Sequence, residues 1–170
     1  MDVAAAAAYL PAMDAWLLPL AIVAATVVAM EMLAAVVHRY VMHGWGWGWH
    51  RSHHEPRKGW FELNDLYALV FAGLSLLFFS ALAAFWAPLW WVGVGTVVYG
   101  LLYGIVHEGL VHRRFPLPRS WQRGYLKRLV QAHRLHHAVR SRDGAVSFGF
   151  LYAPRPQALR HRLREQGAER

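Results

Sequence analysis

Residues 66–106 read LYALVFAGLSLLFFSALAAFWAPLWWVGVGTVVYGLLYGIV and contain no charged side chain. Pro88 divides this stretch into two apolar segments, residues 66–87 and 89–106. Each segment is close to the ~20 residues that a helix needs to cross a ~30 Å hydrocarbon core. Because so little chain separates the two segments, we expect two transmembrane helices that form a tight hairpin.

A third apolar segment covers residues 16–37 and is interrupted only by Glu31. Hydrophobic residues make up 56% of the 170-residue chain and charged residues 16%, which favours a membrane protein over a soluble one. The length suits one domain rather than two. The sequence therefore predicts a single all-α membrane domain, residues 1–170, with three transmembrane helices and further helices at the membrane interface.

The distribution of positive charge predicts the orientation of these helices. All eighteen Lys and Arg residues lie at or after Arg39, and none lies between Gly59 and His112. Under the positive-inside rule, residues 38–65 and 107–154 then share the cytoplasmic face, and the N-terminus lies outside. The tryptophans agree with two interfacial belts: an outer one of Trp16, Trp86, Trp90 and Trp91, and an inner one of Trp45, Trp47, Trp49, Trp60 and Trp121.

The net charge of +8 is concentrated beside the membrane segments. It favours attraction to anionic lipid, so we expect a lipid bilayer and no nucleic acid as partner. The first dozen residues lack the positive n-region of a cleavable signal peptide, and residues 4–8 are a lead-in of alanines. The polar, basic residues 155–170 are expected to form a helix that is solvated or lies on the membrane surface.

Histidine is the residue type that carries the chemistry. Ten of the eleven histidines follow the spacings HxxxxH, HxxHH, HxxxxH and HxxHH, so that one unit occurs after the first and again after the third apolar segment. His161 stands alone in the tail, and no site role is expected for it. The four clusters are His38 and His43; His50, His53 and His54; His107 and His112; and His133, His136 and His137.

Helix geometry explains one of the two spacings. At about 100° per residue, the three imidazoles of HxxHH lie within about 60° of one another on an α-helix and can face one metal centre. The two histidines of HxxxxH are about 140° apart, so they cannot easily share one metal on a regular helix. Either they serve two metals or the helix breaks between them. Gly44, Gly46 and Gly48 indicate that the first helix ends just after His43.

The number of histidines narrows the choice of metal. The chain has no cysteine, which excludes thiolate ligands, and imidazole alone suits Zn, Cu, Fe or Ni. Ten ligands are too many for a structural or a catalytic zinc site, but they suit two metals with about five each. We favour two redox-active iron ions that bind O₂ over haem and over a hydrolytic zinc enzyme. A non-enzymatic electron-transfer or metal-handling membrane protein is the alternative of a different class.

Acidic residues adjoin the histidine clusters. Glu55, Glu62, Asp65 and Glu108 could accept hydrogen bonds from ligand imidazoles and set their tautomers. Glu62 and Asp65 could equally cap the second transmembrane helix. Glu31 lies two turns before His38 and shares its face, so it either bonds a ligand, lines a cavity or packs in a protonated form.

The four clusters resemble the pattern of the fatty acid hydroxylase superfamily of membrane di-iron enzymes. Two stretches are similar to its carotene hydroxylase branch in particular: HRSHHEPRKGWFELNDLYALVFA, residues 50–72, and HRLHHAVRSRDGAVSFGFLYAP, residues 133–154. The resemblance covers residues 31–154. It implies that all ten clustered histidines hold two iron ions, with no further catalytic residue.

The resemblance also implies a reaction, the O₂-dependent hydroxylation of beta-carotene at C3 of its rings to give beta-cryptoxanthin and then zeaxanthin. Hydroxylation, desaturation or ketolation of a sterol, a fatty acyl chain or another carotenoid is the alternative on the same site. No dinucleotide fingerprint occurs, so electrons are expected from a ferredoxin-type donor. Either steering of that acidic carrier or membrane anchoring explains the basic residues Arg113, Arg114, Arg119, Arg123, Lys127 and Arg128.

The sequence departs from the family in one respect. The family is often drawn with four membrane crossings, whereas three are expected here, because residues 121–139 are too charged to span. We expect them to form an interfacial helix that places His133, His136 and His137 beneath the bundle. A bacterial inner membrane, with the metal site on its cytoplasmic side, suits so compact a chain.

Overall fold

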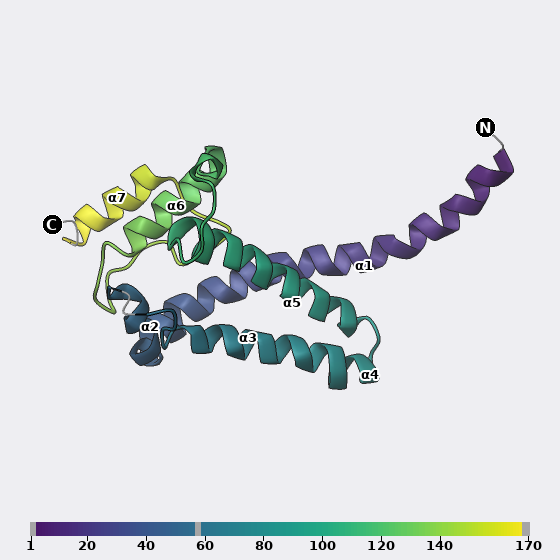
Figure 1. The fold of residues 1–170 in the computed structure, drawn as a ribbon, viewed down its shortest axis with the longest axis horizontal. Helices are drawn as coiled ribbons and strands as arrows, with labels where there is room; N and C mark the ends of the chain where they lie inside the picture. Colours follow the sequence, from purple (N-terminus) through teal and green to yellow (C-terminus); the bar gives the residue numbers. More distant parts are fainter. Residues whose placement is uncertain (1–2, 57–58, 168–170) are drawn as a thin grey trace.

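The computed structural model describes residues 3–56 and 59–167, and within these residues every regular element is helical (Figure 1). In chain order the elements are α1 (Val3–Val36), the π-helix η1 (Val37–Trp45), α2 (Trp47–His54), α3 (Asp65–Leu77), the π-helix η2 (Phe78–Leu82), α4 (Ala83–Phe85), α5 (Leu89–Tyr103), the π-helix η3 (Gly104–Val111), the 3₁₀-helix η4 (Arg119–Trp121), α6 (Gly124–His136) and α7 (Pro156–Glu165).

Three continuous helices are long and apolar enough to cross a membrane: Ala15–Trp45, Asp65–Phe85 and Leu89–Val111. They confirm the three predicted segments. The first and third run past the predicted ends at residues 37 and 106, because the π-helices η1 and η3 continue α1 and α5. Residues 86–88 form the turn between the second and third helices, so the expected hairpin is present (Figure 1).

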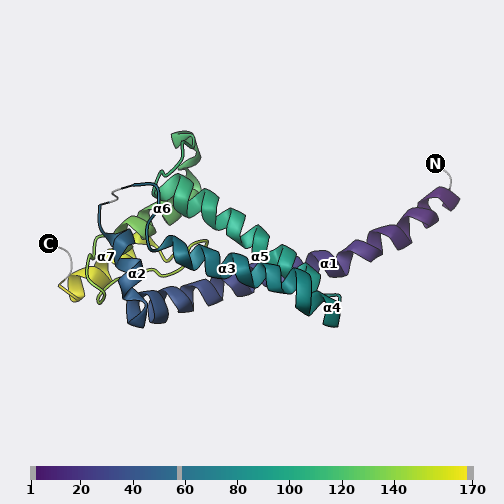
Figure 2. The ribbon, with the colours of Figure 1, turned by 60° about the horizontal axis from the view of Figure 1, so that its bottom comes forward.

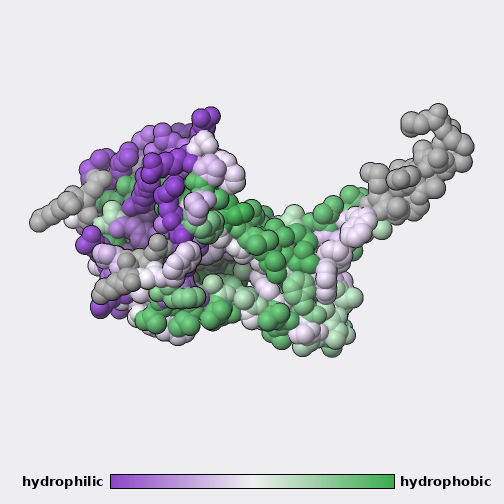
Figure 3. Space-filling model, viewed as in Figure 1, coloured by the Kyte–Doolittle hydropathy of each residue, from purple (hydrophilic) through white to green (hydrophobic). Residues whose placement is uncertain are grey.

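The surface of the bundle is apolar along the three helices. Side chains such as Leu18, Met32, Leu69 and Leu101 are more than half exposed, as expected for contact with lipid rather than water. Figure 3 shows hydrophobic residues along the helices and hydrophilic residues gathered at the end formed by α6 and α7. The chain is therefore an integral membrane protein with one polar end.

Close packing of α1 on α5 depends on a glycine. A Cβ atom on Gly95 of α5 would lie 2.5 Å from Cβ of Thr26 on α1, nearer than real side chains approach. Such small residues let transmembrane helices approach closely and gain van der Waals contact. Gly100, one turn and a half further along α5, has nothing within 4 Å of its Cβ position.

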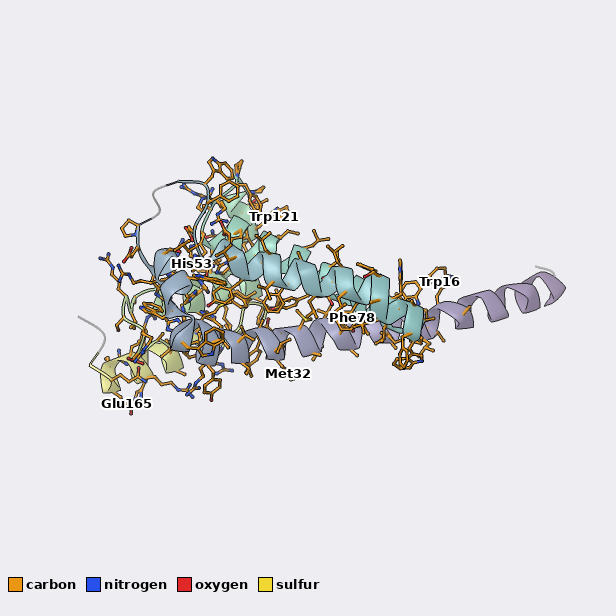
Figure 4. All side chains as sticks on the ribbon, turned by 90° about the horizontal axis from the view of Figure 1, so that it is seen from below. Trp16, Met32, His53, Phe78, Trp121 and Glu165 are labelled. Carbon is orange, nitrogen blue, oxygen red and sulfur yellow. The ribbon has the colours of Figure 1, made fainter. Side chains whose placement is uncertain are left out.

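Tryptophans mark both ends of the bundle. Trp16 and Trp91 pack edge to face with ring centroids 5.9 Å apart, and Trp90 lies 5.0 Å from Trp91. Figure 4 shows Trp16 far from His53, whereas Trp121 lies near the His53 end of the bundle. These positions agree with the two predicted aromatic belts.

The polar end is a small core of its own, built on α6 and α7. Helices α6 and α7 lie beside each other (Figures 1 and 2). Leu159 and Leu163 of α7 are fully buried against a cluster that includes Leu129 and Ala132 of α6. The tail was expected to be solvated or to lie on the membrane surface. The helix is present and most of its residues are exposed, but it also packs into the fold, because the spacing of the two leucines gives it an apolar face. Residues 168–170 of that tail lie outside the described residues.

We expect Gly95→Val to lower the free energy of unfolding by about 1–3 kcal/mol, because the added side chain must displace Thr26. The matched control is Gly100→Val, whose side chain enters open space. Thermal unfolding in detergent, followed by tryptophan fluorescence, should show a lower midpoint for the first variant only. Equal midpoints would mean that α1 and α5 do not pack this closely.

Candidate metal centre

The ten clustered histidines converge at the polar end of the bundle. Their Nε2 contacts divide them into two groups of five, called site A and site B. In site A, consecutive Nε2 atoms are 3.1–3.2 Å apart, in the order His38, His50, His54, His136 and His43. In site B, Nε2 distances of 3.2, 3.1 and 2.9 Å join His53 to His107, His112 to His133, and His133 to His137.

The two sites adjoin each other. His54 and His136 of site A and His137 of site B offer ligand atoms within 4.8 Å of one another. The rings of His54 and His137 are also stacked, with centroids 4.4 Å apart. Two metal ions bound at these sites would therefore be neighbours, as a dinuclear centre requires.

The π-helices explain the HxxxxH spacing. The backbone N–H of His112 donates to the carbonyl of His107, 3.0 Å away, which is an i→i+5 bond. In this geometry residues five apart lie on the same side of the helix, so His107 and His112 both reach site B. His38 and His43 reach site A in the same way on η1. The expected angle of about 140° applies to an α-helix only, and the spacing gave no sign that these two segments are π-helical.

The helix break expected after His43 is present. Gly44 has non-helical dihedral angles, with φ −113° and ψ −125°, and α2 begins anew at Trp47. This break turns the chain so that α2 carries His50, His53 and His54 back toward η1.

The two HxxHH clusters each divide between the sites. On α2, His50 and His54 reach site A and His53 reaches site B. On α6 and the residue that follows it, His133 and His137 reach site B and His136 reaches site A. Each site thus receives four histidines from one sequence unit and the middle histidine of the other unit's HxxHH. This exchange ties the first and third spanning helices together through the site.

The outer nitrogens of most ligands have hydrogen-bond acceptors. The Nδ1–H groups of His38, His43, His54 and His136 donate to the carbonyls of Phe148, Arg142, Val139 and Val146, at 2.7–3.0 Å. His50 donates to Oδ1 of Asn64 at 2.7 Å, and His53 and His107 donate to Glu62 and Glu108 at 2.9 and 2.6 Å.

These bonds show that the sites fit a metal ion. An imidazole that donates from Nδ1 in its neutral form has a bare lone pair on Nε2. The Nε2 atoms of His38 and His50 are then two acceptors 3.1 Å apart, and no hydrogen bond can join them. A cation between such lone pairs removes the repulsion, and an outer bond at Nδ1 is the usual support of a histidine ligand.

Burial favours the same protonation state. Eight of the ten histidines are buried, and His112 and His137 are partly buried. Desolvation lowers the pKa of His50 to about 3, that of His54 to about 4 and that of His112 to about 3. These three imidazoles are therefore neutral near pH 7, which is the form that binds metals.

Three of the acidic residues expected near the ligands lie beside site B and share Arg114. The guanidinium lies 2.8 Å from Asp65, 3.2 Å from Glu108 and 3.6 Å from Glu62. Glu62 and Glu108 contact ligand histidines directly, whereas Asp65 reaches them through Arg114. This network fixes the carboxylates that orient two ligands of site B.

The other two acidic candidates lie elsewhere. Glu55 pairs with Arg51 at the surface, at 2.8 Å. Glu31 lies on α1 and accepts bonds from the backbone N–H groups of residues 150–152 at 2.9–3.0 Å, and from the Tyr99 hydroxyl at 2.9 Å. His161 forms an exposed pair with Glu165, as expected for a residue outside the site.

Glu31 acts on site A through the segment that it holds. The carbonyl of Phe148 accepts the Nδ1–H of His38, and the ring of Phe150 stacks on His38 with centroids 5.0 Å apart. Non-helical backbone beside apolar helices is stable only when its polar groups have partners. Glu31 accepts hydrogen bonds from three of these backbone N–H groups at once. Nothing in the sequence pattern indicated this role.

Several residues of the site carried no signal in the sequence. Asn64 and the carbonyls of residues 139, 142, 146 and 148 become ligand supports only through tertiary contacts. Arg114 stands two residues after His112, so its place near site B could have been inferred, but its three carboxylate partners could not.

An apolar cavity of about 540 Å³ lies between α1, α3 and α5. Its walls include Phe71, Leu76, Phe79, Val97 and Leu101. The end of the cavity nearest the histidines is lined by Asn64, Tyr103, Glu108 and Phe150, each of which contacts one of the ten histidines. An apolar molecule could thus approach both metal sites from within the bundle.

The chain is similar to known proteins over most of its length. The family described as fatty acid hydroxylase matches residues 23–153. The beta-carotene hydroxylases of Pantoea ananas and Pseudescherichia vulneris are 58% and 60% identical to it, over 91% and 85% of this chain and 89% and 82% of theirs. The chloroplastic beta-carotene 3-hydroxylase of Haematococcus lacustris is 40% identical over 78% of this chain and 42% of its own. No solved structure matches significantly.

The division into two sites predicts how metal is lost. We expect the double variant His50→Ala/His54→Ala to bind one metal ion per chain in place of two, because it removes two ligands from site A alone. His133→Ala/His137→Ala should likewise lose only the ion of site B, and His161→Ala should lose none. Elemental analysis of the purified variants measures this. Loss of both ions from either double variant would mean that the sites do not fill independently.

We expect Glu31→Ala to weaken metal binding at site A by about 10–100-fold, the usual effect of removing an outer support. Glu31→Gln keeps an oxygen acceptor for the three backbone N–H groups and should retain most of the affinity. Glu55→Ala is the control, because its partner Arg51 is at the surface. Metal titration of the three variants measures these affinities. Full affinity in Glu31→Ala would show that residues 148–152 keep their position without Glu31.

Proposed function

We propose that this chain, which belongs to the fatty acid hydroxylase family, hydroxylates beta-carotene at C3 of its rings to give beta-cryptoxanthin and then zeaxanthin. The observation that carries the proposal is the similarity to beta-carotene hydroxylases along nearly the whole chain. The chloroplastic relatives named beta-carotene 3-hydroxylase support position C3.

Sites A and B supply the ligands for two iron ions. C3 of the ring is not allylic, so its C–H bond is strong, and general acid–base chemistry cannot break it. Iron held by the ten histidines would supply the activation of O₂ that such a bond requires. In the overall reaction, one oxygen atom enters the C–OH group and the other leaves as water, with two electrons and two protons consumed.

The apolar cavity suits a hydrocarbon substrate. Beta-carotene dissolves in the bilayer, so its ring must reach the site from between the helices. The cavity volume of about 540 Å³ lies within the ordinary range for ligand pockets. At the end of the cavity nearest the histidines, Tyr103 and Glu108 lie beside His107. A ring that enters from the opposite, apolar end of the cavity therefore stops at the proposed metal ligands. The apolar walls also exclude water from the reacting carbon.

The sidedness of the protein follows from its charges. Every Lys and Arg lies at or after Arg39, and the polar end that carries α6 and α7 also carries the histidines. This asymmetry supports a cytoplasmic location for the polar end, with the chain in a bacterial inner membrane. Electrons come from a soluble ferredoxin-type donor, since the chain has no dinucleotide-binding fingerprint.

The experiment is pigment analysis of a beta-carotene-producing bacterial strain that expresses the chain. We expect zeaxanthin with the intact sequence and with His161→Ala, and unchanged beta-carotene with His136→Ala, because His136 is a fully buried member of site A. Chromatography of the extracted pigments, with immunoblots of the membranes, measures product and protein together.

Unchanged beta-carotene despite iron-loaded protein in the membrane would contradict the carotenoid assignment. It would direct the search to sterols and fatty acyl chains on the same centre. A keto product would assign the chemistry to C4 instead.

A further inference from the structure

The ten histidines differ in how far they reach the surface. His112 and His137 are partly exposed, whereas the other eight are buried, and both belong to site B. An opening of about 330 Å³ at the polar end is lined by His53, His54, His112 and His137. Site B is thus the part of the centre that faces water.

Two arginines stand on the rim of this opening. Arg134 of α6 and Arg140 line it, both are exposed, and neither forms an ion pair within residues 3–56 and 59–167. The carboxylate on the rim, Glu55, is paired with Arg51. The rim therefore has an excess of positive charge directly beside the exposed ligand edges.

The basic stretch that stood out in the sequence, residues 113–128, does not line this opening. Arg114 is held by three carboxylates, and Arg128 donates to the carbonyls of Ala153 and Pro154. Arg119 and Arg123 are exposed, but they do not line the opening. Position in the fold, rather than charge alone, singles out Arg134 and Arg140.

The opening and the apolar cavity lie on different sides of the centre. The cavity is lined mainly by residues of α1, α3 and α5, and the opening by residues from the ends of α2, η3 and α6. Glu108 of η3 also borders the cavity, but the two linings have no residue in common. A hydrocarbon can therefore occupy the cavity while a water-soluble protein covers the opening. The two reactants that must meet at the centre do not compete for space.

We propose that an acidic, one-electron iron–sulfur protein of the ferredoxin class docks over this opening, with its carboxylates on Arg134 and Arg140 and its cluster next to His112 and His137. This inference rests on the proposed function, which requires two electrons for each hydroxylation. Two reduced carriers bind in turn, and each is oxidised by one electron at the site B edge; the two protons come from water.

Such an encounter is small and held mainly by charge. Interfaces between redox partners bury little area, and complementary charges raise the association rate. Because exposed charges are screened within about 10 Å at 0.1 M salt, binding should weaken as salt is added.

The test uses the iron-loaded protein in lipid nanodiscs and a plant-type [2Fe–2S] ferredoxin as probe. The variant is Arg134→Glu/Arg140→Glu, and the matched control is Arg119→Glu/Arg123→Glu, which makes the same change of charge away from the opening. Three quantities are measured: the Kd for oxidised ferredoxin without carotenoid at low and high salt, the KM for reduced ferredoxin, and the iron content.

We expect the Arg134 and Arg140 variant to raise Kd and KM by about tenfold, with kcat and iron content retained and the salt dependence reduced. The control should match the unaltered protein. Unchanged Kd in the variant, an equal loss in the control, or no binding by the unaltered protein overturns the proposal. Ferredoxin that binds at the rim without any hydroxylation of beta-carotene supports the docking site and removes the proposed substrate.

Discussion

The Nδ1–H···O hydrogen bonds of the ligand histidines are the interactions on which the rest of the structure depends. They hold seven of the ten imidazoles in the tautomer that directs an Nε2 lone pair inward, as at His38 and His50. Lone pairs 3.1 Å apart repel one another, and a cation bound between them would remove that repulsion. Most acceptors are backbone carbonyls of residues 139–148, so a segment without regular secondary structure serves as the frame of the centre.

Two departures from the α-helix make this frame possible. The π-helices η1 and η3 continue the first and third spanning helices and align histidines that are five residues apart. π-Helical turns are rare and occur mainly at functional sites. Glu31 then allows irregular backbone to lie against α1, since it accepts three backbone N–H groups that would otherwise lack partners. The π-helices and the Glu31 contacts both position the histidines where the spanning helices meet the polar end.

The centre lies where two media meet, which suits its proposed chemistry. The apolar cavity approaches the ligands from the helices through Tyr103 and Phe150, and the opening beside His112 and His137 approaches them from water. A hydrocarbon and an electron carrier are therefore served by separate surfaces of one small domain. Each site takes four histidines from one sequence unit and one from the other, so both sequence units must come together to form either site. This arrangement holds the cavity and the opening next to each other.

The sequence by itself determined the three spanning helices, since uninterrupted hydrophobicity such as that of residues 66–106 is a local property that any packing must respect. It also determined which ten histidines meet, because a spacing repeated in this way is improbable by chance, and it pointed to Glu62 and Glu108 as their neighbours. Only the tertiary structure decided that His53 and His136 cross to the opposite sites, that Asn64 and four carbonyls support the ligands, and that Arg134 and Arg140 border the opening. Residue spacing predicts which side chains share a face of a helix only if the type of helix is assumed. The helix type itself, and the partners that arrive from distant segments, depend on how the helices pack.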